Sequence, residues 1–416
     1  MVTAQRRGTG ANQEAVRRHN LSTLLGQVHL APGPVSRAEL TSAMGLNRST
    51  IGGLVGELTD LGLVGATTAV SGPRQGAGRP SQGVGLSDDG PYVVAVDLGV
   101  DRITVARVGL GGQLHARLPA RVHEDREAWR IAADIAALVR RVVADAPDGA
   151  PLVGIGLAVP GMVRRRDGMV RLAPNLGWSD VSPGPMILAA LGVDVPLRVG
   201  NDADLGALAE HHRGVGVDID DLVYVSGNVG VGAGVVAGGV PLAGAGGYAG
   251  EVGHLALSPA GRDCHCGARG CWETSVGGHE IARTIGCPTD EVANLDLVLE
   301  RYDVAPPGLG GVGRELGQGL AGIVNVLNPQ VVVLGGYFRS LLRLVPGDVR
   351  AGFEEVALPA PQESVSLSLP GLGADSVLLG AAELAFEPLL ADPAGALAGA
   401  LPDAARVLGA GAVTSA

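Results

Sequence analysis

Residues 264–273, with the sequence CHCGARGCWE, place three of the four cysteines of this chain within eight positions. Three thiolates together with the imidazole of His254 make a ligand set of the number and type that a tetrahedral structural zinc site uses. Gly267 and Gly270 would allow so short a loop to fold around an ion. The spacing predicts one structural zinc ion per chain, with ligands His254, Cys264, Cys266 and Cys271. A loop of reduced thiols without a metal is the alternative.

The composition indicates a large protein without a membrane segment. A length of 416 residues suggests two to three domains, and because aromatic residues make up only 3%, Val, Leu, Ala and Ile must fill the core. The chain contains no run of about 18 uncharged apolar residues and no apolar signal region at its N-terminus. We therefore expect a cytoplasmic protein with no membrane partner, in which clustered cysteines hold metals more often than they form disulfides.

The net charge of −11 is unevenly distributed. Residues 1–85 contain eight Arg and four acidic residues, whereas the rest of the chain contains 23 Arg and 38 acidic residues. A small basic head on a large acidic body suggests a head that binds a polyanion, with ordinary surface variation as the alternative. The chain has no Lys, so phosphate contacts must use Arg, backbone N–H or hydroxyl groups, and catalysis by lysine is excluded.

The first 65 residues predict three helices. Helical spacing gives the first helix one apolar face, formed by Leu21, Leu24, Leu25 and Val28. Pro32 and Pro34 end this helix. Ser36 and Glu39 have the spacing of a capping box, in which each side chain satisfies a free backbone donor, and they predict the start of the second helix.

The second and third helices follow the pattern of a helix-turn-helix. Gly45 makes the turn, Asn47 can cap the third helix, and the inner face of that helix is Ile51, Leu54, Val55 and Leu58. Two short helices joined by a tight glycine turn are typical of this DNA-binding unit, and "LGLV" with a glycine-rich return resembles its wing. We expect a winged helix-turn-helix with its linker over residues 1–85, with hinge composition at 72–90. A plain helix packing unit is the alternative.

Residues 90–390 predict an α/β body. Helical stretches at 127–144 and 313–327 alternate with strand candidates, which read "PYVVAVDLGV", "ITVARVG", "LVGIGLAVP", "LVYVSG", "GVVAGG" and "VVVLGG". Residues 392–416 are rich in Ala and Gly and are predicted to form a loosely ordered tail.

These motifs together resemble the ROK family (repressors, open reading frames and sugar kinases) over nearly the whole chain. The matching stretches are "VDLGV", "VPGMV", "APNLGW", "NDAD", "GNVGVGAG", "EVGHLALSPAGRDCHCGARGCWE" and "NVLNPQVVVLGG". The stretch from Glu251 to Glu273 is the most specific. The resemblance implies an α/β body with the two-lobed actin/hexokinase-like (ribonuclease H-like) ATPase fold. The winged helix-turn-helix head separates regulators of this family from its kinases.

The resemblance also implies a sugar-binding cleft near residues 200–275. The family's sugar contacts match Asn201, Asp202, Glu251, His254 and Glu273, and Asn175 of "APNLGW" is a further candidate. Carboxylates and amides exchange hydrogen bonds with vicinal hydroxyls, and a mispaired hydroxyl is costly in a dry pocket. In the family the His/Cys₃ set binds zinc, which would hold His254 and its loop rigid. Solvated surface acids are the alternative.

The phosphate loops depart from those of the family's kinases. The kinases carry Asp-x-Gly-Gly-Thr in the first loop, where this chain reads DLGVD at 97–101. Val100 adds a side chain where backbone must approach phosphate, and Asp101 repels it. The second loop, GNVGVG at 227–232, lacks the kinases' Gly-Thr-Gly. Asp202 matches the kinases' general base and is interpreted as vestigial, so we expect no catalytic residue and no enzyme.

Four residues are candidates for DNA contact. Arg48, Ser49 and Thr50 lie at the N-terminal end of the third helix, the end that reads bases in this motif. Arg79 of "GAGRP", which resembles the segment after the wing in related regulators, could enter a minor groove or touch phosphate. Glycines at 52, 53 and 56 each cost roughly 1 kcal/mol of helix stability but would let the helix backbone approach DNA closely.

The sequence therefore predicts a sugar-responsive transcriptional regulator, more specifically a repressor, that binds operator DNA as a homodimer or homotetramer. A sugar or sugar derivative in the cleft would shift the geometry of the head through the linker. Two alternatives stay open. One is an ATP-dependent sugar kinase with an accessory DNA-binding head, which the altered first phosphate loop disfavours. The other is a regulator controlled by a protein partner, which the retained cleft residues disfavour.

Overall fold

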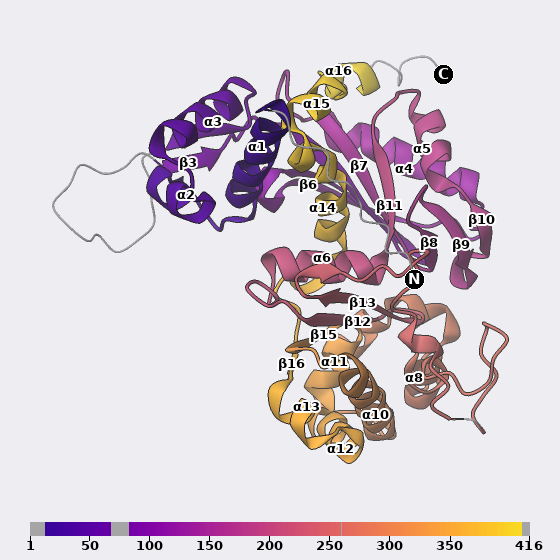
Figure 1. Cartoon of the computed structure of the whole chain (residues 1–416). Coiled ribbons are helices and arrows are strands. Elements are labelled where there is room, and N and C mark those ends of the chain that lie inside the picture. Colours follow the sequence, from indigo (N-terminus) through magenta and orange to yellow (C-terminus); the bar gives the residue numbers. More distant parts are fainter. Residues whose placement is uncertain (1–12, 68–82, 259, 410–416) are drawn as a thin grey trace, which may run out of the picture.

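The computed structural model describes residues 13–67, 83–258 and 260–409 and has a small N-terminal head beside a body of two stacked lobes (Figure 1). The head is joined to the upper lobe, and the lower lobe lies below helix α6 (Asp202–Arg213) in this view. Within the described ranges, no helix is long and apolar enough to cross a membrane.

The head forms its three helices at the predicted positions: α1 (Gln13–Leu30), α2 (Arg37–Met44) and α3 (Arg48–Asp60). The capping box at Ser36 is complete, Gly45 adopts a left-handed φ of 63° at the end of α2, and the Asn47 side chain caps α3. All eight apolar residues predicted to face inward on the first and third helices are buried. A three-stranded sheet completes the head, in the order β1 (Val35–Ser36), β3 (Gly83–Leu86), β2 (Val64–Thr67).

The predicted hinge at residues 72–90 is wrong for residues 83–86. Residues 83–86 form the central strand of the head's sheet, since β3 pairs with both β1 and β2. The glycine-rich composition concealed this strand, but Val84 is buried in the head and Leu86 packs against the same core. In the sequence, residues 68–82 lie between β2 and β3, and residues 87–91 separate β3 from β4.

The upper lobe is built on a mixed five-stranded sheet. Its order is β11 (Leu197–Asn201), β7 (Leu152–Val159), β4 (Tyr92–Leu98), β5 (Arg102–Gly109), β6 (Gln113–Arg121), with β4 parallel to β7 and antiparallel to β5. Alternate residues of β4 face opposite sides: Val94 and Val96 contact α4 (Ala128–Val143), whereas Val93 and Ala95 face α14 (Ser376–Ala391). Helix α5 (Pro183–Leu191) and the small sheet β8 (Met162–Arg164), β9 (Met169–Ala173), β10 (Trp178–Val181) complete this lobe.

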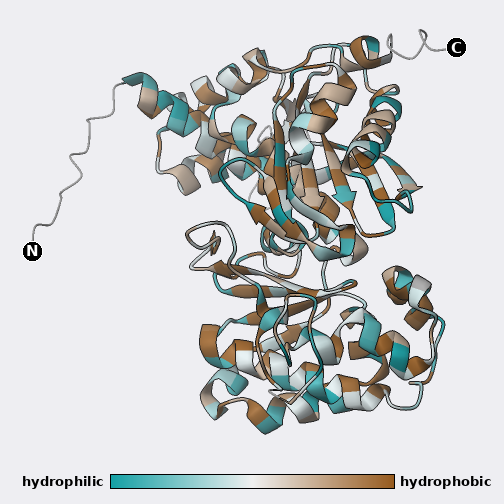
Figure 2. Ribbon diagram, turned by 90° about the vertical axis from the view of Figure 1, so that its right-hand side faces the viewer, coloured by the Kyte–Doolittle hydropathy of each residue, from teal (hydrophilic) through white to brown (hydrophobic). Residues whose placement is uncertain are grey.

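The lower lobe has a second five-stranded sheet. Its order is β14 (Val240–Pro241), β13 (Val231–Ala237), β12 (Leu222–Gly227), β15 (Val331–Gly336), β16 (Ser366–Ser368). One face packs on α6, and the other is covered by α7 (Glu273–Val276), α8 (Gly278–Ile285), α9 (Leu295–Glu300), α10 (Leu309–Leu327), α11 (Phe338–Leu344) and α12 (Pro346–Val356). Helix α13 (Pro359–Ser364) contacts α10. Figure 2 shows the hydrophobic strands inside both lobes. The six predicted body strands all form, and α4 and α10 occupy the two predicted helical stretches.

The expectation of a loosely ordered tail is wrong for residues 392–409. These residues form two short helices, α15 (Pro393–Ala398) and α16 (Ala404–Gly409), and Leu401 pairs with Leu152 of the upper sheet. Ala404 and Leu408 are buried against α4. The small side chains that suggested disorder instead allow close packing on the lobe.

Candidate functional site

A pocket between the two lobes brings together every residue predicted to contact a ligand. Its walls come from the end of β4, the junction of β11 with α6, the turn between β12 and β13, and the cysteine loop. The predicted residues that line it are Asn175, Asn201, Asp202, Glu251, His254 and Glu273. Residues separated by almost a hundred positions in the sequence therefore face one pocket.

Asn201 fixes the start of α6 at the floor of this pocket. Its Oδ1 accepts hydrogen bonds from the backbone N–H of Ala203 at 2.8 Å and of Asp204 at 3.0 Å, and its Nδ2 donates to the Gly161 carbonyl at 2.9 Å. This is helix capping, because the side chain satisfies donors that have no partner inside the helix. One amide hydrogen of Asn201 is left for a ligand, so its main role is structural, which the sequence interpretation missed.

Asp202 follows in the first turn of α6 and is held on both oxygens. Its Oδ1 accepts from the Ala203 N–H at 2.9 Å, and its Oδ2 accepts from Asn228 Nδ2 at 3.2 Å. Asn228 belongs to the turn between β12 and β13 and was not among the predicted residues. Its place in the "GNVGVG" turn, next to the strand end, is the signal that could have identified it.

The pocket floor is crowded with carboxyl groups whose ionisation is unfavourable. Burial, with repulsion from Asp97, raises the pKa of Asp202 from its usual 3.8 to about 7. Burial and repulsion from Asp202 raise the pKa of Asp204 to about 7, and burial raises that of Asp97 to about 6. Burial also raises the pKa of Glu251. A ligand that donates hydrogen bonds from hydroxyl groups would relieve this unfavourable ionisation.

Glu273 connects the pocket to the cysteine loop. Its Oε2 accepts from the Val231 N–H at 2.9 Å, and its Oε1 lies 3.8 Å from Cys264 Sγ. Gly230 permits this approach, because a Cβ there would collide with the Glu273 carboxylate. Glu273 therefore bridges the β12–β13 turn and the loop that follows Glu251.

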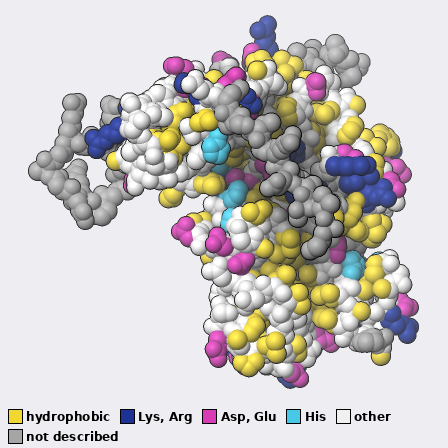
Figure 3. Space-filling view, viewed as in Figure 1, with side chains coloured by type: hydrophobic (Ala, Val, Ile, Leu, Met, Phe, Trp, Pro, Cys, Tyr) yellow, Lys and Arg dark blue, Asp and Glu magenta, His cyan; other side chains and the backbone are white. Residues whose placement is uncertain are grey.

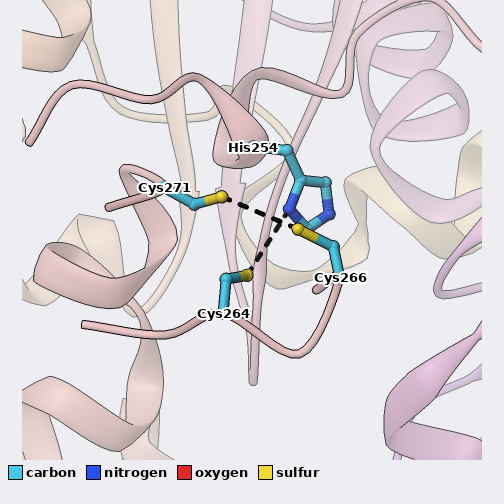
Figure 4. A group of neighbouring side chains, drawn as sticks. All are labelled: His254, Cys264, Cys266 and Cys271. Atoms are coloured by element: carbon cyan, nitrogen blue, oxygen red, sulfur yellow. Dashed lines mark hydrogen bonds between the residues drawn. The ribbon is translucent and has the colours of Figure 1, made fainter. Parts of the chain in front are cut away.

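The four predicted metal ligands form one compact cluster (Figure 4). The ligand atoms of His254, Cys264, Cys266 and Cys271 all lie within 4.8 Å of one another, with Cys264 Sγ 3.7 Å from His254 Nδ1 and Cys266 Sγ 3.7 Å from Cys271 Sγ. Three thiols and an imidazole at these separations fit around a single tetrahedral metal ion. Cys287 lies outside the cluster.

His254 faces both the metal cluster and the pocket. Its Nδ1 is the nitrogen nearest the cysteines, while its Nε2 lies 4.0 Å from Glu251 Oε2. One imidazole can thus bind a metal through one nitrogen and present the other to a ligand. The two predicted roles of His254 are geometrically compatible.

The side of the pocket expected to hold phosphate is lined by apolar side chains from both lobes. Val100 of the first phosphate loop packs against the apolar cluster that Val229 of the second loop forms with Ala282 and Val292 of the lower lobe. Asp101 pairs with Arg126 at 2.9 Å, and Arg126 in turn donates to the Asn175 carbonyl at 3.2 Å. Both altered loop residues therefore have contacts of their own within the protein.

The predicted DNA contacts occupy the exposed start of α3. Arg48 and Ser49 are exposed and Thr50 is half-buried. The Asn47 side chain accepts from Ser49 Oγ at 2.6 Å and from the Thr50 N–H at 2.9 Å, so these two residues are also part of the helix cap. Arg79 lies outside the described residues.

A family model places the chain among known proteins. The model of the ROK family matches residues 93–387. The chain is 28% identical over 385 residues to the xylose repressor of Bacillus spizizenii, a match that covers 91% of this chain and 98% of that repressor. It is also 28% identical over 309 residues to the glucokinase of Halalkalibacterium halodurans, covering 70% of this chain and 93% of the glucokinase.

The comparison of structures gives a similar result. The fold is similar to the crystal structure of a ROK family transcriptional regulator that is a homologue of the E. coli MLC protein, with a TM-score of 0.72 and 26% identity. That match covers 95% of this chain and 99% of the regulator. A ROK family glucokinase from Streptomyces griseus has a TM-score of 0.59 and covers 70% of this chain.

Replacing Asp202 with Asn should stabilise the protein, and by more at high pH. Because the pKa of Asp202 is raised from 3.8 to about 7, the free energy of unfolding falls as the pH rises from about 4 through 7. Asn cannot ionise, so at about 1.36 kcal/mol per pKa unit we expect a gain of about 4 kcal/mol at pH 8 and about 2 kcal/mol at pH 5. Thermal unfolding at both pH values measures this, with the exposed Asp145→Asn as control. A gain independent of pH would contradict the assignment.

Proposed function

Because the chain belongs to the ROK family, we propose that it is a DNA-binding transcriptional repressor controlled by a sugar or sugar derivative in the interlobe pocket. The family and the two-lobed actin/hexokinase-like fold confirm the prediction made from the sequence. The observation that carries the proposal is the share of this chain over which each relative aligns. The xylose repressor aligns over 91% of the chain, whereas the glucokinase aligns over 70%. The repressor match therefore extends beyond the kinase-like body.

Sugar binding is supported by the chemistry of the pocket. Asp202, Glu251 and Glu273 offer carboxylate oxygens, while Asn175 and the free nitrogen of His254 add further polar atoms. Such groups pair with the vicinal hydroxyls of a sugar. Burial raises the pKa of Asp202 and of Glu251, so both carboxyl groups would gain from the hydrogen-bond donors of a bound ligand. Asn201 contributes mainly by holding α6 in place.

The alternative of a sugar kinase is disfavoured by the apolar and acidic side chains in the phosphate loops. Val100 and Val229 place apolar side chains where a triphosphate needs backbone N–H groups or cations. Asp101 adds a negative charge on the same side, and the chain has no Lys to offset it. We therefore propose that Asp202 binds the sugar without acting as a general base.

The metal in the His/Cys₃ cluster is proposed to be one structural zinc ion. His254, Cys264, Cys266 and Cys271 fill all four positions of a tetrahedral site, which leaves no open position for a catalytic water. Zinc would make this loop rigid. Because it would join His254 to Cys271, it would fix the carboxylates on either side of the loop, Glu251 and Glu273.

The head is proposed to bind operator DNA through the start of α3. Arg48 and Ser49 are exposed there. Arg79, in the segment that resembles the one after the wing in related regulators, is a further candidate. Because helix-turn-helix proteins read two half-sites as dimers, we expect a homodimer or homotetramer acting in the cytoplasm.

The test of this function is a DNA-binding assay with a sugar panel. DNA fragments selected from a random library by the full chain are titrated with and without D-xylose, D-glucose and related sugars. At least one sugar should weaken DNA affinity by about 5-fold to 150-fold. Sugar-dependent ATP hydrolysis abolished by Asp202→Asn, without a DNA response, would instead establish the kinase.

Replacing Glu251 with Ala should abolish the sugar response and leave DNA binding without sugar near normal. Glu251 lines the pocket and pairs with His254, so its loss removes contacts in the pocket and none in the head. The exposed Glu354 of α12 provides a matched control, since Glu354→Ala removes an equal charge far from the pocket. A Glu251→Ala protein that responds like the parent would show that the pocket is misassigned.

Replacing Cys266 with Ser should lower the zinc content from one ion per chain to nearly none and weaken the sugar response. A serine hydroxyl is a poor substitute for a thiolate ligand. Metal analysis of the purified protein is the direct measurement, and Cys287→Ser should keep its zinc, because Cys287 lies outside the cluster. Zinc-free parent protein with an intact sugar response would refute the site.

Replacing Gly53 with Ala should stabilise the head but weaken DNA binding. No atom lies within 4 Å of the position of a Cβ at Gly53, so alanine adds up to about 1 kcal/mol of helix stability. If α3 approaches DNA closely, that methyl group occupies the contact and operator affinity falls several-fold. Gly26→Ala, an equally open glycine in α1, should stabilise without changing affinity. Unchanged DNA affinity for Gly53→Ala would contradict a close approach at this position.

A further inference from the structure

The head is fastened to the body by a buried ion network at the end of α1. Glu383 of α14 accepts from Arg213 Nε at 2.6 Å and lies 3.1 Å from His212 Nδ1 and 3.1 Å from His29 Nε2. His29 belongs to the last turn of α1 and is fully buried, and the Glu383 side chain is 2% exposed. Three elements therefore meet at one carboxylate: α1 of the head, α6, and α14 of the upper lobe.

Additional hydrogen bonds fix the geometry of this junction. Arg213 Nη1 donates to the His29 carbonyl at 3.1 Å, which satisfies a backbone acceptor at the end of α1. The Gly111 N–H donates to His29 Nδ1 at 3.0 Å. A buried carboxylate that loses its partners is strongly unfavourable, so α1 cannot separate from α6 and α14 without a cost.

The wing side of the head is less tightly attached. A groove separates the wing from the upper lobe, with Gly65 and Ala66 on the head side and Gln113 and Arg213 on the body side. Figure 3 shows this notch between the head and the lobes, with histidine side chains on its wall. The head also shares one apolar core with α14, in which Leu24 and Leu25 of α1 lie in the same cluster as Phe386. The junction at Glu383 is the polar part of this attachment, and the wing side stays open.

Helix α6 connects this junction directly to the ligand pocket. Its first residues, with the Asn201 cap, form the pocket floor, and its last residue, Arg213, binds Glu383. Twelve helical residues span about 18 Å, so the two ends belong to one rigid element. Figure 1 shows α6 lying between the lobes, with α14 rising from it toward α1.

The contact between α6 and α14 is too close to allow independent sliding. A Cβ at Gly380 of α14 would collide with the Leu205 backbone carbonyl of α6. Glu383 lies one turn farther along α14 than this contact. A displacement of the start of α6 therefore has to move the Arg213–Glu383 pair, because packed backbones transmit strain instead of absorbing it.

We propose that α6 carries the ligand signal from the pocket to the head, and that Glu383, Arg213 and His29 are the positioning residues that convert it into a new head orientation. This proposal rests on the proposed function. It differs from a route through residues 87–91, which join the wing to β4 and make no contact with α6 in the network described above. Removing the Glu383 network should therefore uncouple sugar binding from DNA binding, while the pocket and the head each stay intact.

The experiment compares Glu383→Gln with Glu387→Gln in the full chain. Glu387 lies one turn along the same helix and also forms an ion pair, with Arg198 at 2.6 Å, but this pair is exposed and does not touch the head. Each protein is titrated with the selected DNA fragment, with and without D-xylose and D-glucose. Sugar binding is measured separately by calorimetry.

The parent and Glu387→Gln should show equal sugar responses, of about 5-fold to 150-fold in DNA affinity. Glu383→Gln should bind sugar and DNA within about 3-fold of the parent while its response falls below about 2-fold. Because Glu383→Gln leaves the buried Arg213 unpaired, a second protein carries Arg213→Gln as well, which removes both charges and keeps similar side-chain volumes. Circular dichroism confirms folding, and the double variant is the deciding protein if the single one unfolds.

A full sugar response in the folded Glu383→Gln or double variant would overturn the proposal and leave the proposed function standing. Loss of sugar binding itself would also overturn it, since the network would then act on the pocket and not on the coupling. If the parent binds no DNA, or no sugar changes its DNA affinity, the proposed function fails and this proposal fails with it.

Discussion

The hydrogen bonds that Asn201 accepts from Ala203 and Asp204 are the constraint on which the rest of this architecture depends. They start α6 at the floor of the pocket, and the third bond, from Asn201 to the Gly161 carbonyl, ties that start to the upper lobe. Once the helix begins there, its length determines that Arg213 reaches α14 and α1. One helix, α6, therefore contributes to the pocket, to the interface between the lobes and to the attachment of the head.

The cysteine cluster imposes a second, more local constraint. The loop between Glu251 and Glu273 has little regular structure, and its side chains alone give it a small core. Glu273 is fixed from one side by the Val231 N–H, and the cluster at Cys264 approaches it from the other. A metal ion at this point would replace the hydrophobic core that so short a loop cannot build. The metal would then position the two carboxylates, Glu251 and Glu273, without itself contacting the bound sugar.

Much of this arrangement could be predicted from the sequence, and the failures have physical causes. Capping signals at Ser36 and Asn47 placed the head helices correctly, because cap geometry is local. The specific spacing of the cysteines identified a cluster that the fold brings together. By contrast, β3 was taken for a hinge, since strand pairing in a glycine-rich segment depends on partners far along the chain. The role of Glu383 escaped notice for the same reason: its partners lie 170 to 354 residues away.

The valine side chains in the phosphate loops affect which metabolite concentrations would set the occupancy of the pocket. A kinase cleft closes on two substrates, so its occupancy depends on the supply of nucleotide as well as sugar. Here Val100 and Val229 line the phosphate side of the pocket with apolar side chains, and we propose that this side does not take a nucleotide. On the proposed function, occupancy then depends on sugar concentration alone. Gene expression under its control would follow nutrient abundance and would be insulated from swings in the energy status of the cell.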